Sequence, residues 1–297
     1  MKRKKLTASM IALVMSVSLP MTTYAANWYL EDGSVTVNAD NSGQTVTQGS
    51  TSTPDEAPVI TQRGSSAETS NTITINASEN ATANVTISNV NIDTSSAAIA
   101  TSGKGNVNIE LDGTNTLKSG REHAGLEKSG DGKLTITDEN ANGKLIATGG
   151  QYGAGIGGGF YEGGKNITIA GGKVTANGGD YGAGIGGGQE GDGSNITITD
   201  GEVIAAGGTN GAGIGGGGGI SGKGEKISIS GDAKLKVQGG SGDYWDGAGA
   251  GIGNGGSHNG DYLSGTIPVN GAETEPDTSN LTTGKIEYYA PGADMTK

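Results

Sequence analysis

One heptapeptide, Gly-Ala-Gly-Ile-Gly-Gly-Gly, recurs at a fixed interval, and this repeat limits what the chain can fold into. The three copies occupy residues 153–159, 182–188 and 211–217, so each begins 29 residues after the one before. A shorter fourth copy, residues 249–253, comes late because residues 241–248 are inserted before it. A repeat of this length predicts stacked structural units that bury their apolar faces against one another.

Two short segments between the glycine motifs have the period of half-buried strands. Residues 166–169 read Asn-Ile-Thr-Ile and residues 173–177 read Lys-Val-Thr-Ala-Asn, with Ala-Gly-Gly between them. Alternating apolar and polar residues, rich in β-branched types, favour strands, and Gly-Gly pairs indicate turns. We therefore predict an all-β chain: a single-stranded, right-handed parallel β-helix of about six to seven coils, about 29 residues each.

The apolar residue inside each glycine motif is expected to stack on its equivalents in the neighbouring coils, about 4.8 Å away. Degenerate copies of the motif extend this ladder toward the N-terminus. Asn166 and Asn195 occupy equivalent positions and are expected to stack and share hydrogen bonds in the same way. The predicted ladder consists of Ile99, Leu126, Ile156, Ile185, Ile214 and Ile252.

The first motif also matches a dinucleotide-binding fingerprint through Gly153, Gly155 and Gly158. That fingerprint requires a strand before it and a helix that starts within it. Here a glycine-rich loop and a further strand follow, and the match recurs in tandem. We therefore assign these glycines to the fold rather than to a nucleotide.

The N-terminus predicts export. Residues 1–25 read as a secretory signal, with basic residues at positions 2–5, an apolar core at residues 6–19 and cleavage after Ala25. No later apolar run is long enough to span a membrane. We expect a secreted, extracellular protein that is either released or held at the cell surface.

The remaining chain divides by composition into three parts. Residues 26–70 are expected to cap the open end of the β-helix, although a loose tether is the alternative. The repeat domain is predicted over residues 71–265, and a loop with a closing strand over residues 266–297.

The chain is acidic, which bears on its partners. Removal of the signal takes away four positive charges and lowers the formal charge from −12 to −16. Such a surface disfavours nucleic acid, anionic lipid and the unaided binding of acidic polysaccharides. Divalent cations could bridge its carboxylates to those of a substrate, while solubility alone is the simpler explanation.

No catalytic constellation is evident in the sequence. The chain has no cysteine, which excludes thiol catalysis and disulfide bonds. His123 and His258 lie in glycine-rich or loop contexts and are expected to be surface residues. The mature chain has only two arginines, Arg63 and Arg121, and we expect Arg121 to form an ion pair in its loop, next to Glu122. We therefore predict that the protein is not an enzyme.

Aromatic residues are few, so their positions are informative. Tyr152 and Tyr181 are 29 residues apart and should stack at one edge of the tube. Exposed aromatic faces stack on the apolar faces of sugar rings, whereas stacked tyrosines can also simply stabilise the ladder. The candidate carbohydrate-binding residues are Tyr152, Tyr181, Phe160, Tyr161, Tyr244 and Trp245.

Acidic residues fall on the same loops as these aromatic residues. Carboxylate oxygens suit calcium, and acidic residues are also common in turns that bind nothing. The candidate calcium ligands are Asp180, Glu190, Asp192, Asp243 and Asp246.

The pattern resembles a group of secreted bacterial carbohydrate-binding domain-containing proteins with a right-handed parallel β-helix and a pectate-lyase-like shape. The likeness covers residues 71–255 and rests on Ala-Ala-Ile at 97–99, on residues 106–117, on His-Ala-Gly-Leu at 123–126 and on the glycine motifs. It implies binding of plant cell-wall polysaccharides, in some members with calcium. The glycine repeats also resemble those of large bacterial surface and adhesin-like proteins.

Three functions follow from these observations. The first is non-catalytic binding of an extracellular polysaccharide along one face of the β-helix. The second is a structural or adhesive surface module that contacts a protein partner. The third is a polysaccharide lyase, which no motif in the sequence supports.

Overall fold

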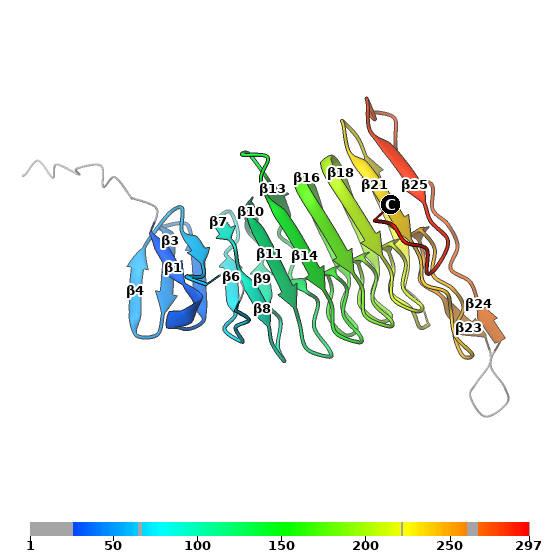
Figure 1. Ribbon diagram of the computed structural model, residues 1–297, viewed down its shortest axis with the longest axis horizontal. Coiled ribbons are helices and arrows are strands. Elements are labelled where there is room, and N and C mark those ends of the chain that lie inside the picture. Colours follow the sequence, from blue (N-terminus) through cyan, green and yellow to red (C-terminus); the bar gives the residue numbers. More distant parts are fainter. Residues whose placement is uncertain (1–25, 65–66, 221, 260–266, 297) are drawn as a thin grey trace, which may run out of the picture.

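The computed structural model describes residues 26–64, 67–220, 222–259 and 267–296, and in this part the chain is an all-β parallel solenoid. It has about seven turns of about 29 residues, as predicted. Figure 1 shows a rod that runs from the blue N-terminal strands to β25 in red. The predicted signal, residues 1–25, lies outside the described residues.

Each turn contributes strands to three faces, which we name after their characteristic residues. The glycine face contains β2 (Val35–Asp40), β6 (Ile73–Ala77), β9 (Ile99–Gly103), β12 (Leu126–Lys128), β15 (Ile156–Gly157), β17 (Ile185–Gly186), β19 (Ile214–Gly215) and β22 (Ile252–Gly253). The isoleucine face contains β1 (Asn27–Tyr29), β5 (Val59–Thr61), β7 (Thr82–Ser88), β10 (Asn106–Asp112), β13 (Leu134–Thr137), the first halves of β16 (Gly164–Asn177) and β18 (Gly193–Ala206), and β20 (Gly224–Ile229). The alanine face contains β8 (Asn91–Asp93), β11 (Thr114–Lys118), β14 (Lys144–Thr148), the second halves of β16 and β18, β21 (Lys234–Gln238) and β25 (Lys285–Tyr288).

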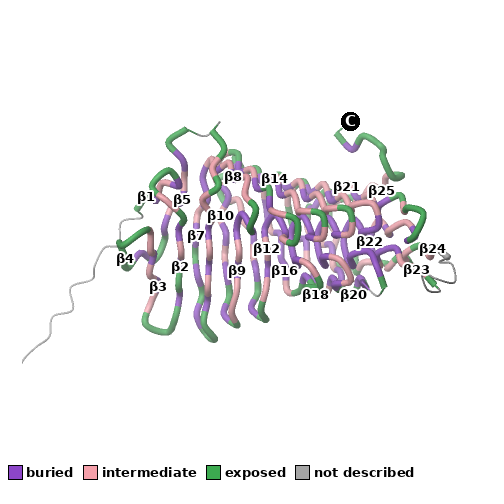
Figure 2. The backbone as a smooth tube through the Cα atoms, turned by 90° about the horizontal axis from the view of Figure 1, so that it is seen from below, coloured by how far each residue is buried: buried purple, intermediate pink, exposed green. Residues whose placement is uncertain are grey.

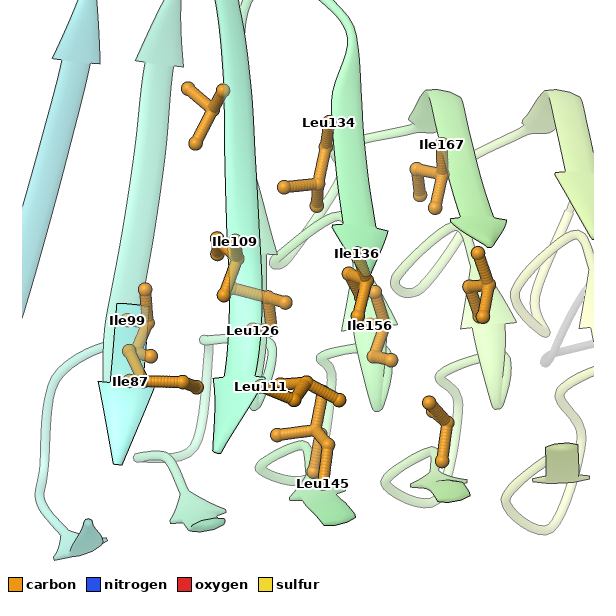
Figure 3. Close-up of a cluster of buried hydrophobic side chains, with 14 of the residues drawn as sticks. Ile87, Ile99, Ile109, Leu111, Leu126, Leu134, Ile136, Leu145, Ile156 and Ile167 are labelled. Atoms are coloured by element: carbon orange, nitrogen blue, oxygen red, sulfur yellow. The ribbon is translucent and has the colours of Figure 1, made fainter. Parts of the chain in front are cut away.

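The predicted ladder is confirmed on the glycine face. Leu126 pairs with Ile99 on one side and with Ile156 on the other, and the parallel register continues without a shift to Ile252. The same register extends the ladder to Ile73 and Val35. Every residue of the ladder is fully buried, and Figure 3 shows several of them beside side chains from the other two faces in one continuous core.

The glycine motif is needed because the backbones of successive coils touch. A Cβ added at Gly182 would lie 1.8 Å from the carbonyl oxygen of Gly153, and one at Gly211 would lie 1.9 Å from that of Gly182. No heavy atoms can approach so closely, so a side chain at these positions would push the coils apart. The motif leads into a further strand rather than a helix, which is why it is not a dinucleotide site.

Antiparallel strands extend the molecule at both ends of the rod. At the N-terminal end η1 (Leu30–Asp32) follows β1, β3 (Gly43–Gln48) pairs antiparallel with β2, and β4 (Thr51–Pro54) pairs antiparallel with β3. At the other end β23 (Ser257–Asn259) and β24 (Ile267–Val269) form an antiparallel pair, which projects from the rod in Figure 1.

Outward-facing side chains form polar ladders. The Nδ2 of Asn195 donates to the Oδ1 of Asn166 at 2.6 Å, which confirms the predicted contact. Asn108 makes the same bond to Asn84 at 2.9 Å. Figure 2 shows buried and partly exposed residues alternating along the strands. Among the described residues, no helix has the length and apolar character to cross a bilayer.

Candidate ligand-binding ridge

The short strands of the glycine face create a ridge along one edge of the rod. Because β15, β17 and β19 have only two residues each, the turn before this face and the loop after it lie close together. The amide of Gln189 donates to the carbonyl of Tyr152 at 2.8 Å, and the amide of Gly218 donates to that of Tyr181 at 2.7 Å. The ridge therefore consists of described residues from two loops of each coil: 120–123, 149–152, 178–181 and 207–210 from the turns, and 158–163, 187–192, 216–220 and 222–223 from the loops.

Four of the predicted aromatic residues come together on this ridge. The ring centroids of Tyr152 and Tyr181 are 5.8 Å apart, those of Tyr152 and Phe160 are 4.9 Å apart, and those of Phe160 and Tyr161 are 3.8 Å apart. The rings are tilted by 33° to 40° and partly cover one another. Tyr161, at the end of this aromatic row, is 60% exposed, whereas the other three are half-buried.

Arg121 belongs to the aromatic row rather than to an ion pair. Its guanidinium carbon lies 4.8 Å from the centre of the Tyr152 ring, a cation–π distance. Its Nε also donates to Gln151 at 2.9 Å, and Gln151 in turn donates to Asp180 at 3.3 Å. The expected ion pair with Glu122 is therefore wrong: the register stacks Arg121 on the next coil, so its partners come from that coil and not from its neighbour in sequence.

A titratable cluster lies beside the aromatic row, and the sequence alone did not reveal it. The Nδ1 of His123 lies 2.9 Å from the Oε2 of Glu127, which also accepts from the amide of Ala124 at 3.1 Å. Glu162 follows Tyr161 on the adjacent loop. Burial, and then the charge of Glu127, raise the pKa of Glu162 above its ordinary value, while the nearby His123 acts in the opposite direction.

The insert, residues 241–248, carries the other two aromatic candidates. Tyr244 is 79% exposed and Trp245 is 45% exposed. Their ring centroids are 4.9 Å apart and their planes meet at 87°, an edge-to-face arrangement. The backbone turns tightly here because Asp243 Oδ1 accepts from the amides of Trp245 and Asp246, both at 2.8 Å.

The insert rests on the end of the aromatic row. Asn210, 29 residues after Tyr181, is fully buried and donates to the carbonyls of Asp246 and Gly247 at 3.2 and 3.3 Å. The Nδ1 of His258 lies 2.6 Å from the Oδ1 of Asp246. The side chain of His258 is only 8% exposed, so its prediction as a surface residue was wrong. The β23–β24 pair places it against the insert, which a loop context in the sequence could not indicate.

The five predicted calcium ligands do not assemble. Asp192 accepts from the amide of Lys223 at 2.8 Å, Asp246 contacts His258, and Asp180 accepts from Gln151. Glu190 and Asp243 lie on different loops. Within the part of the chain that the structure describes, no three acidic or histidine side chains are placed to hold a metal ion. The five predicted ligands therefore do not form one carboxylate cluster within the described residues, and calcium binding stays a prediction.

Exposed apolar side chains gather along the ridge. In the described part of the chain the large hydrophobic residues that are exposed are Tyr161, Ile220, Tyr244, Trp245 and Tyr288. The first two lie on the ridge and the next two on the insert that extends it, whereas Tyr288 lies on β25 at the end of the alanine face. Four of these five exposed side chains lie along one edge of the rod, which makes that edge the candidate interaction site.

Comparisons with protein-family models, with curated proteins and with solved structures gave no significant match. Function is therefore argued from the ridge itself.

Proposed function

We propose that the protein is an exported, non-catalytic polysaccharide-binding protein that uses the ridge and its insert as the binding surface. The observation that carries this proposal is the concentration of exposed aromatic and apolar side chains, Tyr161, Ile220, Tyr244 and Trp245, along one edge. Aromatic faces pair with the apolar C–H faces of sugar rings, and the polar row of Arg121, Gln151 and Asp180 offers donors and acceptors for sugar hydroxyls.

The likeness noted in the sequence supports a plant cell-wall polysaccharide as the ligand class and the extracellular space as the location. An edge that runs along the rod suits an extended polymer, because successive coils are about 4.8 Å apart and place Tyr181 beside Tyr152. Calcium binding stays a prediction, which the comparison of retention with calcium and with chelator tests, because the predicted ligands form no group of three within the described residues.

The test is retention of the purified protein on a panel of neutral and acidic polysaccharides, with calcium and with chelator. The ridge variants are Tyr161→Ala and the pair Tyr244→Ala/Trp245→Ala. The matched control is Tyr288→Ala, which removes an exposed aromatic residue, 55% exposed, that lies away from the ridge. We expect at least tenfold weaker retention for the ridge variants, as for central aromatic contacts in other interfaces, and no change for the control.

Other outcomes point to other functions. If the wild-type protein is retained on no polysaccharide, the proposal fails and a structural or adhesive module becomes the better explanation. The hydrogen-bonded Asn84–Asn108 and Asn166–Asn195 pairs on the outer side of the isoleucine face favour that second candidate. Release of new unsaturated ends would indicate a lyase, and loss of retention in chelator would bring calcium back.

A further inference from the structure

We infer that a buried clamp of Asn210, Asp246 and His258 fixes the insert on the ridge. The clamp positions Tyr244 and Trp245 as the ligand-contacting end of the aromatic row, for the apolar face of a sugar ring. The part of this inference that concerns sugar rests on the proposed function, whereas the clamp itself does not.

Asn210 occupies the position at which the row of tyrosines would continue. The amides of Tyr181 and Asn210 donate to the carbonyls of Gln151 and Asp180, so the two residues are equivalent in successive coils. A tyrosine at position 210 would meet the insert, whereas the shorter amide fits beneath it and donates to the carbonyls of Asp246 and Gly247.

Stability alone does not account for an asparagine at the buried position 210. Its Oδ1 is buried and has no hydrogen-bond partner within the described residues. A buried acceptor without a partner costs about 1–3 kcal/mol. Local costs of this kind concentrate at functional sites, where the geometry they maintain is useful. We assign the cost at Asn210 to holding the insert in place.

Asp246 and His258 supply the second half of the clamp. The two side chains are 4% and 8% exposed and their contact distance is 2.6 Å. One comes from the insert and the other from β23, so the contact joins two segments that no strand pairing connects directly. The amide of Gly247 also donates to the carbonyl of Ser257 at 2.9 Å, next to His258.

The clamp holds the inner side of the insert against the ridge, and the outer side of the insert is exposed to solvent. Asp246 points inward to His258, while the two residues before it, Tyr244 and Trp245, are exposed. Preorganised aromatic contacts bind more tightly because less side-chain and loop entropy is lost on binding. The clamp residues are therefore positioning residues, and they need not touch the ligand.

The clamp can be tested without any ligand. Trp28 is buried and 9% exposed, so quencher-accessible tryptophan fluorescence in the full chain reports on Trp245. We expect His258→Gln and Asp246→Asn each to raise the accessibility of Trp245 and to speed proteolysis within the insert. The double variant should be no worse than either single variant, because the two residues act through one contact.

His123→Gln is the matched control, because it breaks a histidine–carboxylate contact of 2.9 Å at another point of the ridge. It should leave Trp245 unchanged. Unchanged quenching and proteolysis in both His258→Gln and Asp246→Asn would overturn the clamp. If either variant does not unfold cooperatively, the exchanged pair Asp246→His/His258→Asp provides a second test, and we expect it to restore wild-type quenching.

Ligand retention then separates the clamp from the proposed function. We expect clamp variants to lose retention by about tenfold, the loss also expected for the pair Tyr244→Ala/Trp245→Ala, since both changes remove the positioned aromatic contact. A wild-type protein that binds no polysaccharide defeats the proposed function, while quenching still decides the clamp. Variants that expose Trp245 yet bind normally would defeat the positioning role.

Discussion

The coils that contain the full glycine motif, which we call the regular coils, and the coil that precedes them share one register. They differ in the residues that they place at the ridge. In the regular coils Gly157 pairs with Gly186, and in the preceding coil the residue that pairs with Gly157 is Glu127. Lys128 follows at the position that Gly158 occupies in the next coil. The positions that follow the ladder residue can therefore hold either glycine or titratable side chains, while the ladder itself is unchanged.

This difference separates what the repeat does from what the site does. Where glycine recurs, the backbones of neighbouring coils are in contact and leave no space for a functional side chain. Where side chains replace glycine, as at His123 and Glu127, ionisable groups collect beside the aromatic row. The most regular part of the sequence thus reports the architecture, and the irregular parts report the candidate site.

The largest effect is expected from adding a methyl group to the regular part. In Gly182→Ala the new Cβ would lie 1.8 Å from the oxygen and 2.4 Å from the carbonyl carbon of Gly153, which are backbone atoms in a stacked coil. Overpacking against atoms that cannot turn away should cost more than about 3 kcal/mol in unfolding free energy. Denaturant unfolding of the two proteins measures this loss.

Gly64→Ala is the control for that substitution. A Cβ at Gly64 would have no atom within 4 Å, so the change should stay within about 0.5 kcal/mol. Equal effects at Gly64 and Gly182 would mean that the coils do not touch through their glycines.

A slightly smaller loss is expected from the buried ladder. Ile185 is fully buried between Ile156 and Ile214, so Ile185→Ala leaves a cavity that the stacked backbones cannot close. The expected cost is about 3 kcal/mol, measured by the same unfolding experiment. Ile204→Ala on the outer side of the alanine face, where Ile204 is only half-buried, should cost much less. Similar losses would contradict the inward direction of the ladder.

Periodicity made the fold predictable from the sequence. Apolar residues at a constant spacing can stack in only one register, and that register is correct at Leu126, Ile156 and Ile185. The Asn166–Asn195 contact followed from the same logic, because equivalent positions in a solenoid are always neighbours. The aromatic pair Tyr152–Tyr181 was predictable for this reason as well.

The contacts that make the candidate site depend on loops, and loops have no period. His258 reaches Asp246 only because β23 pairs with β24, and Glu162 approaches Glu127 only because the strands of the glycine face are short. In the sequence, each of these residues is indistinguishable from a solvated surface residue. The same limit applies to Asp192 and Asp243, two of the predicted calcium ligands, which accept hydrogen bonds from backbone amides in two different loops.

The preceding coil also predicts a pH-dependent stability. The Lys128 side chain is 3% exposed and donates to the carbonyl of Gly130 at 2.9 Å. Burial, and then the charge of Lys165, lower the pKa of Lys128 from 10.5 to about 8. Between these two pH values the folded protein holds fewer protons than the unfolded chain, so stability rises with pH across that window, by roughly 3 kcal/mol.

Lys128→Met should remove that rise, because methionine has a similar length and no proton to lose. The unfolding free energies of the wild type and the variant are compared from pH 7 to 11, so that groups common to both cancel. If the difference in unfolding free energy between the two proteins does not change with pH, the pKa of Lys128 is the same in the folded and the unfolded protein. The equivalent glycine of a regular coil has no titratable side chain, so it cannot make stability depend on pH.

The smallest effect tests the charges beside the aromatic row. The pKa of Glu162 is raised above 4.5, so the folded protein holds more protons than the unfolded chain just above that pH. Stability should therefore fall as pH rises from about 4.5 through the folded pKa, and Glu162→Gln should remove the fall. Because solvent screens this exposed carboxylate, we expect less than about 1 kcal/mol, measured as the difference between the two unfolding curves. Glu127→Gln should make this loss of stability smaller, because it removes a charge that raises the pKa of Glu162. An unchanged loss in that variant would mean that the two carboxylates do not interact electrostatically.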